Sequence, residues 1–514
     1  MIEFNSKSMK YPYLFILVLS LISTSCKQAN RSDESGGLAE DLPNIVYILA
    51  DDLGYGDLSS LNSESAITTP NMDGIVNEGI HFTDAHSNSA VCTPTRYGVL
   101  TGRYAWRSPL KTGVLWGYDT LLIERDRMTV ASYLKDNGYA TACIGKWHLG
   151  LGWQAKDETK PIVRYGRKKH FKKDSDSNVD FSKPAIGPND IGFDYSYIIP
   201  ASLDMSPYVY LENGKVIEWP TAFTPGKRPQ VAGRGIIWRA GEKSPSFDFN
   251  ETLDHFSEKA IHYISSQKEN KKPFFLYFPI TAPHTPWLPG QDFVGKSDAG
   301  RYGDFVTHVD QIVGEVIDAL DQNGLNENTL IIVTSDNGAH WTENDKDQYA
   351  HRPNHTARGQ KADIYEGGHH IPYIAKWPGK IKPGSRSSQL MCTTDLLATV
   401  AAIVGKPIIE GGEDSYNMLD AYLGRDSKPI RDYVIHHSLT GIFSIRKGKW
   451  KYTERLGSGG FTKPHKIIPE AGDAPATLFN LEKDYAETTN LYDQYPEIVK
   501  ELASILAKEK NDQY

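Results

Sequence analysis

The sequence is poor in cysteine, with only four in 514 residues. So few cysteines cannot cross-link a chain of this length, which excludes a disulfide scaffold. A basic excess is also missing, because 56 Lys and Arg face 64 Asp and Glu and leave a formal net charge of -8. This balance argues against a nucleic-acid partner, which usually needs a basic surface. Aromatic residues are not scarce: 28 Tyr, 18 Phe and 10 Trp exclude intrinsic disorder and supply a large core.

Long apolar runs are missing too, apart from a short one near the N-terminus, residues 14–22. It falls short of the roughly 20 apolar residues that span a bilayer, and no later segment is long enough. Lys7 and Lys10 precede the run, and small residues and then Cys26 follow it, as in a secretory signal. Cys26 resembles the lipidated cysteine of a bacterial lipobox. We therefore expect an exported periplasmic or outer-membrane lipoprotein, attached to the membrane only through a lipid at Cys26; plain secretion and a chance match are the alternatives.

After about residue 43, apolar runs alternate with helical patterns. The runs are typical of strands buried on both faces of a parallel sheet. They comprise residues 44–50, 140–144, 273–279 and 329–335. Helices are predicted over residues 129–137 and 305–323, each followed by a glycine that ends it. This alternation predicts an α/β fold with a mainly parallel sheet, interrupted over about residues 154–250 by long excursions.

The pattern changes again after about residue 425. Three short strands separated by turns are predicted at residues 433–437, 441–446 and 450–453, and an amphipathic helix over residues 495–508 closes the chain. We expect residues 1–25 to be a signal peptide and residues 26–42 a flexible tether. Residues 43–424 would then form one large domain, and residues 425–514 a small α+β subdomain packed against it.

Oxygen-bearing side chains follow the first and fourth strands. Asp51 and Asp52 come directly after the first strand, and Asp336 and Asn337 follow the fourth. In an open α/β sheet, ligands bind beyond the carboxyl ends of the strands, and hard oxygen ligands suit Ca²⁺ or Mg²⁺. Taken alone, the first pair is equally compatible with an exposed loop, and Asp-Asn-Gly is most often a turn. Together they offer four oxygen ligands at one edge of the sheet.

A further motif begins at Cys92, with Pro94 and Arg96 two and four places later. The residues around it favour a loop running into a helix, whose N-terminus favours anions. The pattern Cys-x-Pro-x-Arg followed by Thr-Gly resembles the maturation signature of formylglycine-dependent sulfatases, members of the alkaline phosphatase superfamily. In that family the cysteine is oxidised to formylglycine (3-oxoalanine), and Cys92 matches it. Thr93 and Thr95 stand where the family usually has Ser or Ala and Ser.

Other segments match the same family in the same order along the chain. A single His or Lys on a loop is usually a solvated or internally bonded side chain, so it is the ordered set that carries the resemblance. The resemblance is strong over residues 44–377 and continues into residues 478–491. The matching residues are Lys146 and His148 after the second strand, His284 after the third strand, and Lys361.

The resemblance implies a sulfatase with a large mixed, mainly parallel sheet flanked by helices, as in alkaline phosphatase, and with a small C-terminal α+β subdomain. It also implies two partners, a sulfated carbohydrate substrate and a formylglycine-generating maturation enzyme. A Ca²⁺ ion would be held by Asp51, Asp52, Asp336, Asn337 and the formylglycine at position 92. Arg96 would hold the formylglycine, Lys146 and Lys361 would bind the sulfate, His148 would be the base for aldehyde regeneration, and His284 would be the acid for the leaving group.

The substrate is less sharply indicated. The segments 92–98 and 101–106 look like bacterial relatives of N-acetylgalactosamine-6-sulfatase, which favours a galactose- or N-acetylgalactosamine-6-sulfate at a chain end. We also expect aromatic and histidine residues near the motifs to contribute to a sugar pocket. The candidates are Trp116, Tyr118, His340, Trp341, His351, His355, His369, His370, His436 and His437. Two alternatives remain: a phosphonate or phosphate ester hydrolase on the same scaffold, and an inactive glycan-binding lipoprotein.

Overall fold

The computed structural model describes residues 42–164, 171–228 and 234–512. The expected signal, tether and lipid anchor at Cys26 lie outside these residues. Within them, no helix combines the length and the apolar character needed to cross a bilayer.

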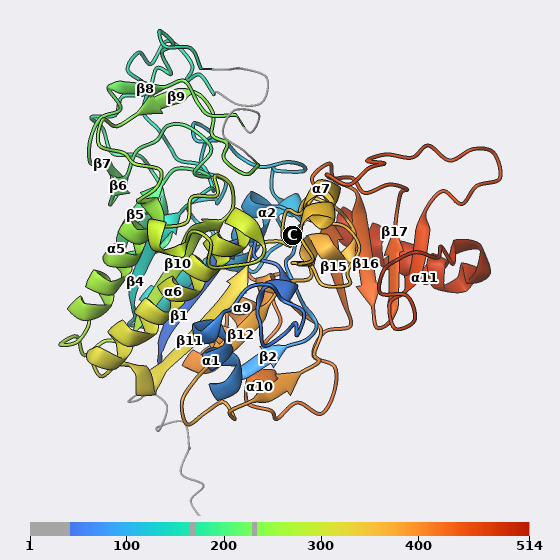
Figure 1. The fold of residues 1–514 in the computed structure, drawn as a ribbon. Coiled ribbons are helices and arrows are strands. Elements are labelled where there is room, and N and C mark those ends of the chain that lie inside the picture. Colours follow the sequence, from blue (N-terminus) through green and yellow to red (C-terminus); the bar gives the residue numbers. More distant parts are fainter. Residues whose placement is uncertain (1–41, 165–170, 229–233, 513–514) are drawn as a thin grey trace, which may run out of the picture.

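A ten-stranded sheet forms the centre of the molecule (Figure 1). Its middle strands β11, β1, β10, β4 and β5 are parallel, and the antiparallel pairs lie toward its two edges, so the predicted mixed, mainly parallel sheet is confirmed. In spatial order the strands are β13 (Ser385–Ser387), β2 (Ile80–Phe82), β12 (Tyr373–Lys376), β11 (Thr329–Ser335), β1 (Asn44–Asp51), β10 (Phe274–Pro283), β4 (Ala140–Lys146), β5 (Tyr195–Ile199), β6 (Leu211–Glu212) and β7 (Lys215–Val216).

Helices cover both faces of this sheet because the central strands are apolar on both sides. Along β1, Tyr47 and Val46 belong to different core clusters, as successive side chains point to opposite faces. One face packs on α1 (Pro70–Glu78), α5 (Thr252–Ser266) and α6 (Gly300–Gln322), which lie in front of the sheet in Figure 1. The other packs on α2 (Cys92–Thr101), α3 (Val130–Asp136) and α9 (Leu396–Val404).

The excursion predicted between the second and third long strands contains mainly short elements and loops. It includes β5 to β7 and a two-stranded ribbon of β8 (Ala222–Thr224) and β9 (Gly241–Lys243), which stands above the sheet in Figure 1. Besides several 3-10 turns, the described residues also form the short elements β3 (Ala85–His86), β14 (Met391–Cys392), α7 (Glu343–Gln348), α8 (Glu366–His369) and α10 (Leu419–Tyr422).

A separate antiparallel sheet lies at the C-terminal end. Its strands in order are β15 (Tyr433–His437), β16 (Phe443–Lys447), β17 (Trp450–Thr453) and β18 (Thr477–Asn480). Helix α11 (Pro496–Asn511) packs on this sheet through Val499, Leu502 and Leu506. The three predicted strands and the final helix are confirmed, whereas the prediction missed β18.

Candidate active site

The carboxyl ends of β1 and β11 bring the two acidic motifs together. Ala50 is paired with Ser335 in parallel register, so Asp51 and Asp336 follow side by side. Asp52 adopts a left-handed backbone conformation, φ 70°, and its N–H donates to Asp336 Oδ1 at 3.2 Å. The side chains of this group are almost completely buried. The predicted meeting of the two motifs at one edge of the sheet is therefore confirmed.

Cys92 is the first residue of α2. The sequence had predicted a loop that runs into a helix, and the structure places Cys92 inside the helix rather than in the loop before it. Its Sγ lies 3.4 Å from Asp51 Oδ1, and only 2% of the residue is exposed. Burial and the nearby Asp336 raise the pKa of the Cys92 thiol above its ordinary value. The unmodified thiol is therefore protonated at neutral pH and is a weak nucleophile.

Three cations surround the acidic group. Arg96 lies one helical turn after Cys92 and donates twice to Asp336 Oδ2, at 3.1 and 2.8 Å, and once to the carbonyl of Lys146 at 2.9 Å. Lys146, the last residue of β4, contacts Asp51 Oδ2 through its ammonium group. Lys361 Nζ lies 2.6 Å from Asp52 Oδ1. Each carboxylate thus faces a positive charge.

The carboxylates nevertheless titrate differently. Burial would raise the pKa of Asp51, but Lys146 and Arg96 hold it below its ordinary value. Burial raises the pKa of Asp52 to about 7, against the attraction of Lys361 and with further repulsion from Asp51 and Asp336. Burial is thus the main reason why Asp52 holds a proton more tightly than Asp51 does.

These residues fit a divalent cation. Asn337 Oδ1 is buried and has no hydrogen-bond partner in the part of the chain that the structure describes, while its Nδ2 donates to Asp52 Oδ1 at 2.7 Å. One ligand atom each from Asp51, Asp52, Cys92 and His284 lie within 4.8 Å of one another. A cluster of carboxylate oxygens with an unpartnered amide oxygen is the donor set that Ca²⁺ or Mg²⁺ takes.

Two histidines lie beside this cluster, each oriented by a backbone carbonyl. His148 follows β4 and places Nε2 at 2.9 Å from the carbonyl of Leu115, so Nε2 carries the proton. The buried Nδ1 has no partner within residues 42–164, 171–228 and 234–512 and can accept a proton. His284 follows β10 and holds its Nδ1 2.5 Å from the carbonyl of Thr285. Burial and neighbouring cations, Lys146 for His148 and Lys361 for His284, lower both pKa values well below the ordinary range. Both rings are neutral at pH 7.

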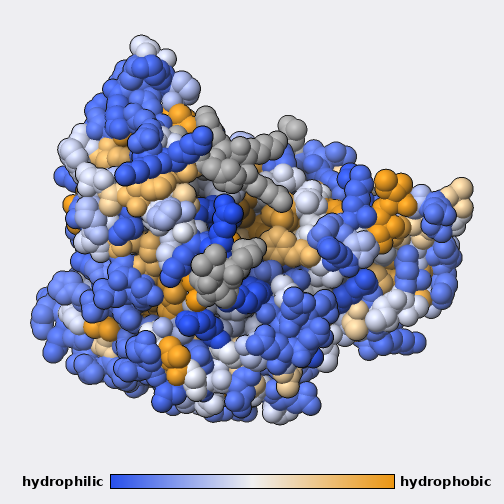
Figure 2. All heavy atoms as spheres, turned by 45° about the horizontal axis from the view of Figure 1, so that its top comes forward, coloured by the Kyte–Doolittle hydropathy of each residue, from blue (hydrophilic) through white to orange (hydrophobic). Residues whose placement is uncertain are grey.

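A cavity of about 510 Å³ opens over these groups. It reaches Cys92, His148, His284 and Lys361 at its base. Figure 2 shows this part of the surface hollowed between the lobe that carries β8 and β9 and the C-terminal sheet. The walls are mostly apolar and aromatic, with a few polar groups: Val91, Gly113, Val114, Trp116, Asp204, Met205, Ile237, Arg239, Thr285, His340, Leu439 and Phe461.

Of the aromatic and histidine candidates, Trp116 and His340 line this cavity. The other candidates do not line it. His351 is fully buried against Asp57, and His369 and His436 stack in a buried group with His86. The sequence did not single out the pocket residues Asp204 and Arg239, because they lie in the irregular excursion, where no motif or periodicity marks them.

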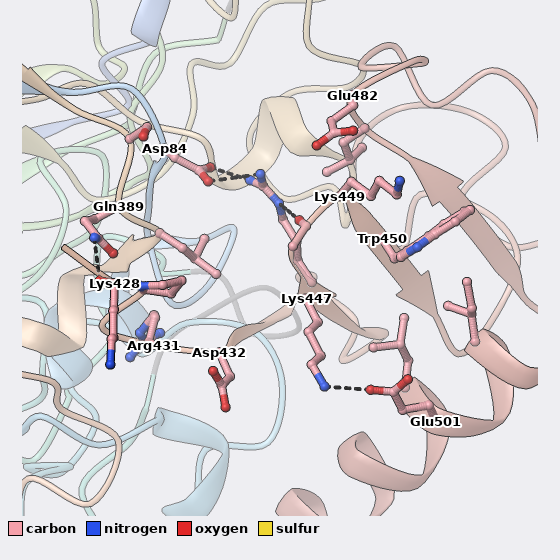
Figure 3. A pocket seen from close by; sticks show the side chains of 18 of the residues that line it. Asp84, Gln389, Lys428, Arg431, Asp432, Lys447, Lys449, Trp450, Glu482 and Glu501 are labelled. Atoms are coloured by element: carbon pink, nitrogen blue, oxygen red, sulfur yellow. Dashed lines mark hydrogen bonds and ion pairs between the residues drawn. The ribbon is translucent and has the colours of Figure 1, made fainter.

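A larger cavity, about 980 Å³, lies between the main sheet and the C-terminal sheet (Figure 3). Two ion pairs join charged side chains of its lining, Arg446 with Asp84, and Lys447 with Glu501 at 2.6 Å. It contains none of the residues of the sulfatase motifs. The chemistry therefore belongs to the smaller cavity.

The family model described as "Sulfatase" matches residues 43–406. The chain is also 35% identical to an N-acetylgalactosamine-6-O-sulfatase of Bacteroides thetaiotaomicron, over 95% of this chain and 96% of that protein. The chain belongs to the sulfatase family.

Other relatives agree with this assignment. The sulfatase is 30% identical to human arylsulfatase A, over 87% of this chain and 83% of that protein. A solved structure from work on glycosaminoglycan metabolism by Bacteroides thetaiotaomicron matches with a TM-score of 0.78 and 33% identity, covering 92% of this sulfatase and all of that chain. The family generally uses a formylglycine and a divalent metal, and the residues around Cys92 are compatible with both.

Proposed function

We propose that this sulfatase hydrolyses a sulfate monoester on the terminal sugar of a sulfated glycan, with galactose- or N-acetylgalactosamine-6-sulfate as the preferred substrate. The observation that carries the proposal is the position of Cys92, buried at the start of α2 and at the base of a cavity lined by Lys361 and two neutral histidines. The relative named N-acetylgalactosamine-6-O-sulfatase supports the choice of sugar and position. A cavity of about 510 Å³ suits one or two sugar units.

In this proposal Cys92 is converted to formylglycine by a maturation enzyme. As formylglycine, residue 92 supplies the hydrated aldehyde whose hydroxyl attacks sulfur and whose second hydroxyl permits release of sulfate. Arg96, anchored on Asp336, keeps this residue and its neighbouring carboxylate in fixed positions. The raised pKa of the unmodified thiol supports the need for conversion.

Calcium is the proposed metal. Asp51, Asp52, Asp336 and Asn337 would hold it together with the modified residue 92. When bound, it supplies positive charge that stabilises the sulfate and lowers the pKa of the attacking hydroxyl. The unpartnered Asn337 Oδ1 and the raised pKa of Asp52 support this choice of ligands.

Lys146 and Lys361 bind the sulfate oxygens in this proposal. Both ammonium groups are buried beside Asp51 and Asp52, so they are held in place and shielded from water before the substrate arrives. Preorganised positive charge in a site that excludes water stabilises the negative charge of the transition state.

His148 and His284 move protons. The unprotonated Nδ1 of His148 accepts the proton when the aldehyde is regenerated. His284 gives a proton to the leaving sugar oxygen. The ring is neutral without substrate, but a sulfate anion bound beside it favours the charged ring and raises its pKa.

The test is an assay of the protein coexpressed with a maturation enzyme, on a panel of sulfated mono- and oligosaccharides. We expect turnover of a 6-sulfated galactose or N-acetylgalactosamine and none by Cys92→Ala. Parallel assays with phosphonate and phosphate esters address the alternative hydrolases. Faster cleavage of these esters than of every sulfate ester would overturn the proposal. An unmodified Cys92 in mass spectra, together with sugar binding but no turnover, would instead favour the inactive glycan-binding protein.

We also propose export and a lipid anchor at Cys26, with residues 43–424 as the catalytic domain and residues 425–514 as the subdomain. The signal-like pattern of residues 7–26 supports export. Membrane fractionation of a bacterium that expresses the protein and its Cys26→Ala variant tests this. We expect the wild type in the membrane fraction and the variant outside it. Equal partitioning of the two would refute the anchor.

A further inference from the structure

One wall of the sulfatase cavity carries an acidic side chain that the proposed chemistry does not use. Asp204 is 5% exposed, and its Oδ2 forms an ion pair with Arg239 Nη1. Its Oδ1 is buried and has no hydrogen-bond partner among the described residues. The Arg239 guanidinium in turn lies over the ring of Trp116, 4.8 Å from the ring centroid. All three residues line the cavity.

This pair is held firmly in place. The backbone N–H of Arg239 donates to the carbonyl of Asp204 at 3.1 Å, and the Tyr208 hydroxyl donates to the carbonyl of Arg239 at 2.7 Å. Burial would raise the pKa of Asp204, but Arg239 and His284 lower it to about 2. Asp204 is therefore a fixed carboxylate at neutral pH, and it can only accept hydrogen bonds.

A buried carboxylate oxygen without a donor is costly, because it has lost water and gained nothing in return. In a cavity, an ordered water supplies the donor until a bound molecule replaces it. The sulfate cannot play this part, since it is an anion and the cations Lys146 and Lys361 lie near Cys92 at the base. The free donors on galactose-6-sulfate are its hydroxyl groups, and N-acetylgalactosamine-6-sulfate adds one amide N–H.

We infer that Asp204 and Arg239 form a subsite that selects a pair of neighbouring free hydroxyls on the sugar ring that carries the sulfate. Asp204 Oδ1 accepts a hydrogen bond from one hydroxyl, and the half-exposed Arg239 guanidinium donates to the oxygen of the next. The inference rests on the proposed function and sharpens it. A sugar that bears a second sulfate on the hydroxyl facing Asp204 has no proton to donate there and is rejected.

The test compares galactose-6-sulfate with its 2-, 3- and 4-deoxy analogues on the matured enzyme. The readout is the ratio of kcat/KM for the parent sugar to kcat/KM for each analogue. In the wild type, removal of the hydroxyl that donates to Asp204 lowers kcat/KM about 10- to 100-fold, the range for a hydrogen bond to a charged group. In Asp204→Ala this ratio falls to about 1.

Each ratio compares two substrates on the same enzyme. If the substitution of Asp204 also alters His284, both kcat/KM values change together and the ratio is unaffected. Asp204→Asn provides a second variant that keeps the shape of the side chain, and its ratio lies between those of Asp204→Ala and the wild type. Asp318→Asn, an exposed carboxylate on α6, is the matched control and keeps the wild-type ratios.

Two results overturn the subsite while leaving the sulfatase intact: equal turnover of all deoxy analogues by the wild type, or unchanged ratios in Asp204→Ala. If the matured wild type cleaves none of the sulfated sugars, the proposed function fails first. These outcomes are distinguishable because the first two require measurable turnover of the parent sugar.

Discussion

Arg96 offers a direct test of how the charged site is held together. The side chain is completely buried and makes two hydrogen bonds to Asp336 Oδ2, one to a backbone carbonyl, and a longer contact of 3.7 Å to Asp51. Arg96→Met keeps much of the volume and removes the charge. Asp336 is then left buried without its principal cation, and breaking a buried ion pair costs about 3–5 kcal/mol.

We expect the variant to lose about that much free energy of unfolding, measured from denaturant midpoints at pH 7 without added metal. Arg107→Met is the matched control, because the Arg107 side chain is only 2% exposed and is paired with Asp414 and Glu509, outside the site. It should lose comparable stability but keep sulfatase turnover, whereas Arg96→Met loses both. A variant of Arg96 as stable as the wild type, or one with full turnover, would refute the reasoning.

Two further predictions address the metal ligands and the contact between the two sheets. Asn337→Ala weakens calcium binding by tenfold or more, measured by calorimetry. Asn326→Ala, which removes another buried amide oxygen without a partner among the described residues, leaves the affinity unchanged. Equal affinities in the two variants would contradict the ligand assignment. Burial would raise the pKa of Asp84, but Arg446 and His86 lower it from 3.8 to about 2. The ionised carboxylate therefore adds about 2 kcal/mol to the free energy of unfolding above pH 4, and this contribution is lost as the pH falls toward 2. Asp84→Asn is therefore less stable than the wild type at pH 7, and thermal melts should show the gap narrowing between pH 4 and pH 3; a constant gap would rule out this linkage.

The sequence predicted the parts of the site that follow long apolar strands. The apolar runs of β1 and β11 can bury both faces only inside a parallel sheet, and parallel register then brings the residues after each strand to one edge. Asp51 and Asp336 were thus predictable as neighbours without any resemblance. The unpartnered Oδ1 of Asn337 was not, because it depends on side-chain orientation.

The subsite formed by Asp204 and Arg239 could not be predicted in this way. Asp204 and Arg239 are separated by 35 positions, and neither lies in one of the long strands or helices that hydrophobic periodicity identifies. Their pairing depends on contacts made by the excursion after it folds against the sheet, including the backbone hydrogen bond between them. Residues positioned by loop packing leave no periodic signal in a single sequence.

The groups near Cys92 were predictable and Asp204 and Arg239 were not, because the two parts of the site have different tasks. In the proposed mechanism the groups around Cys92 act on the charge of the sulfate, and they lie at strand ends and at a helix start, where the backbone fixes them. The groups around Asp204 act on hydroxyls whose arrangement differs from sugar to sugar. Connecting segments such as the loops between β5 and α5 generally tolerate changes in sequence better than the strands and helices that they join. A single scaffold can therefore keep its sulfate chemistry while its choice of sugar is set by the excursion.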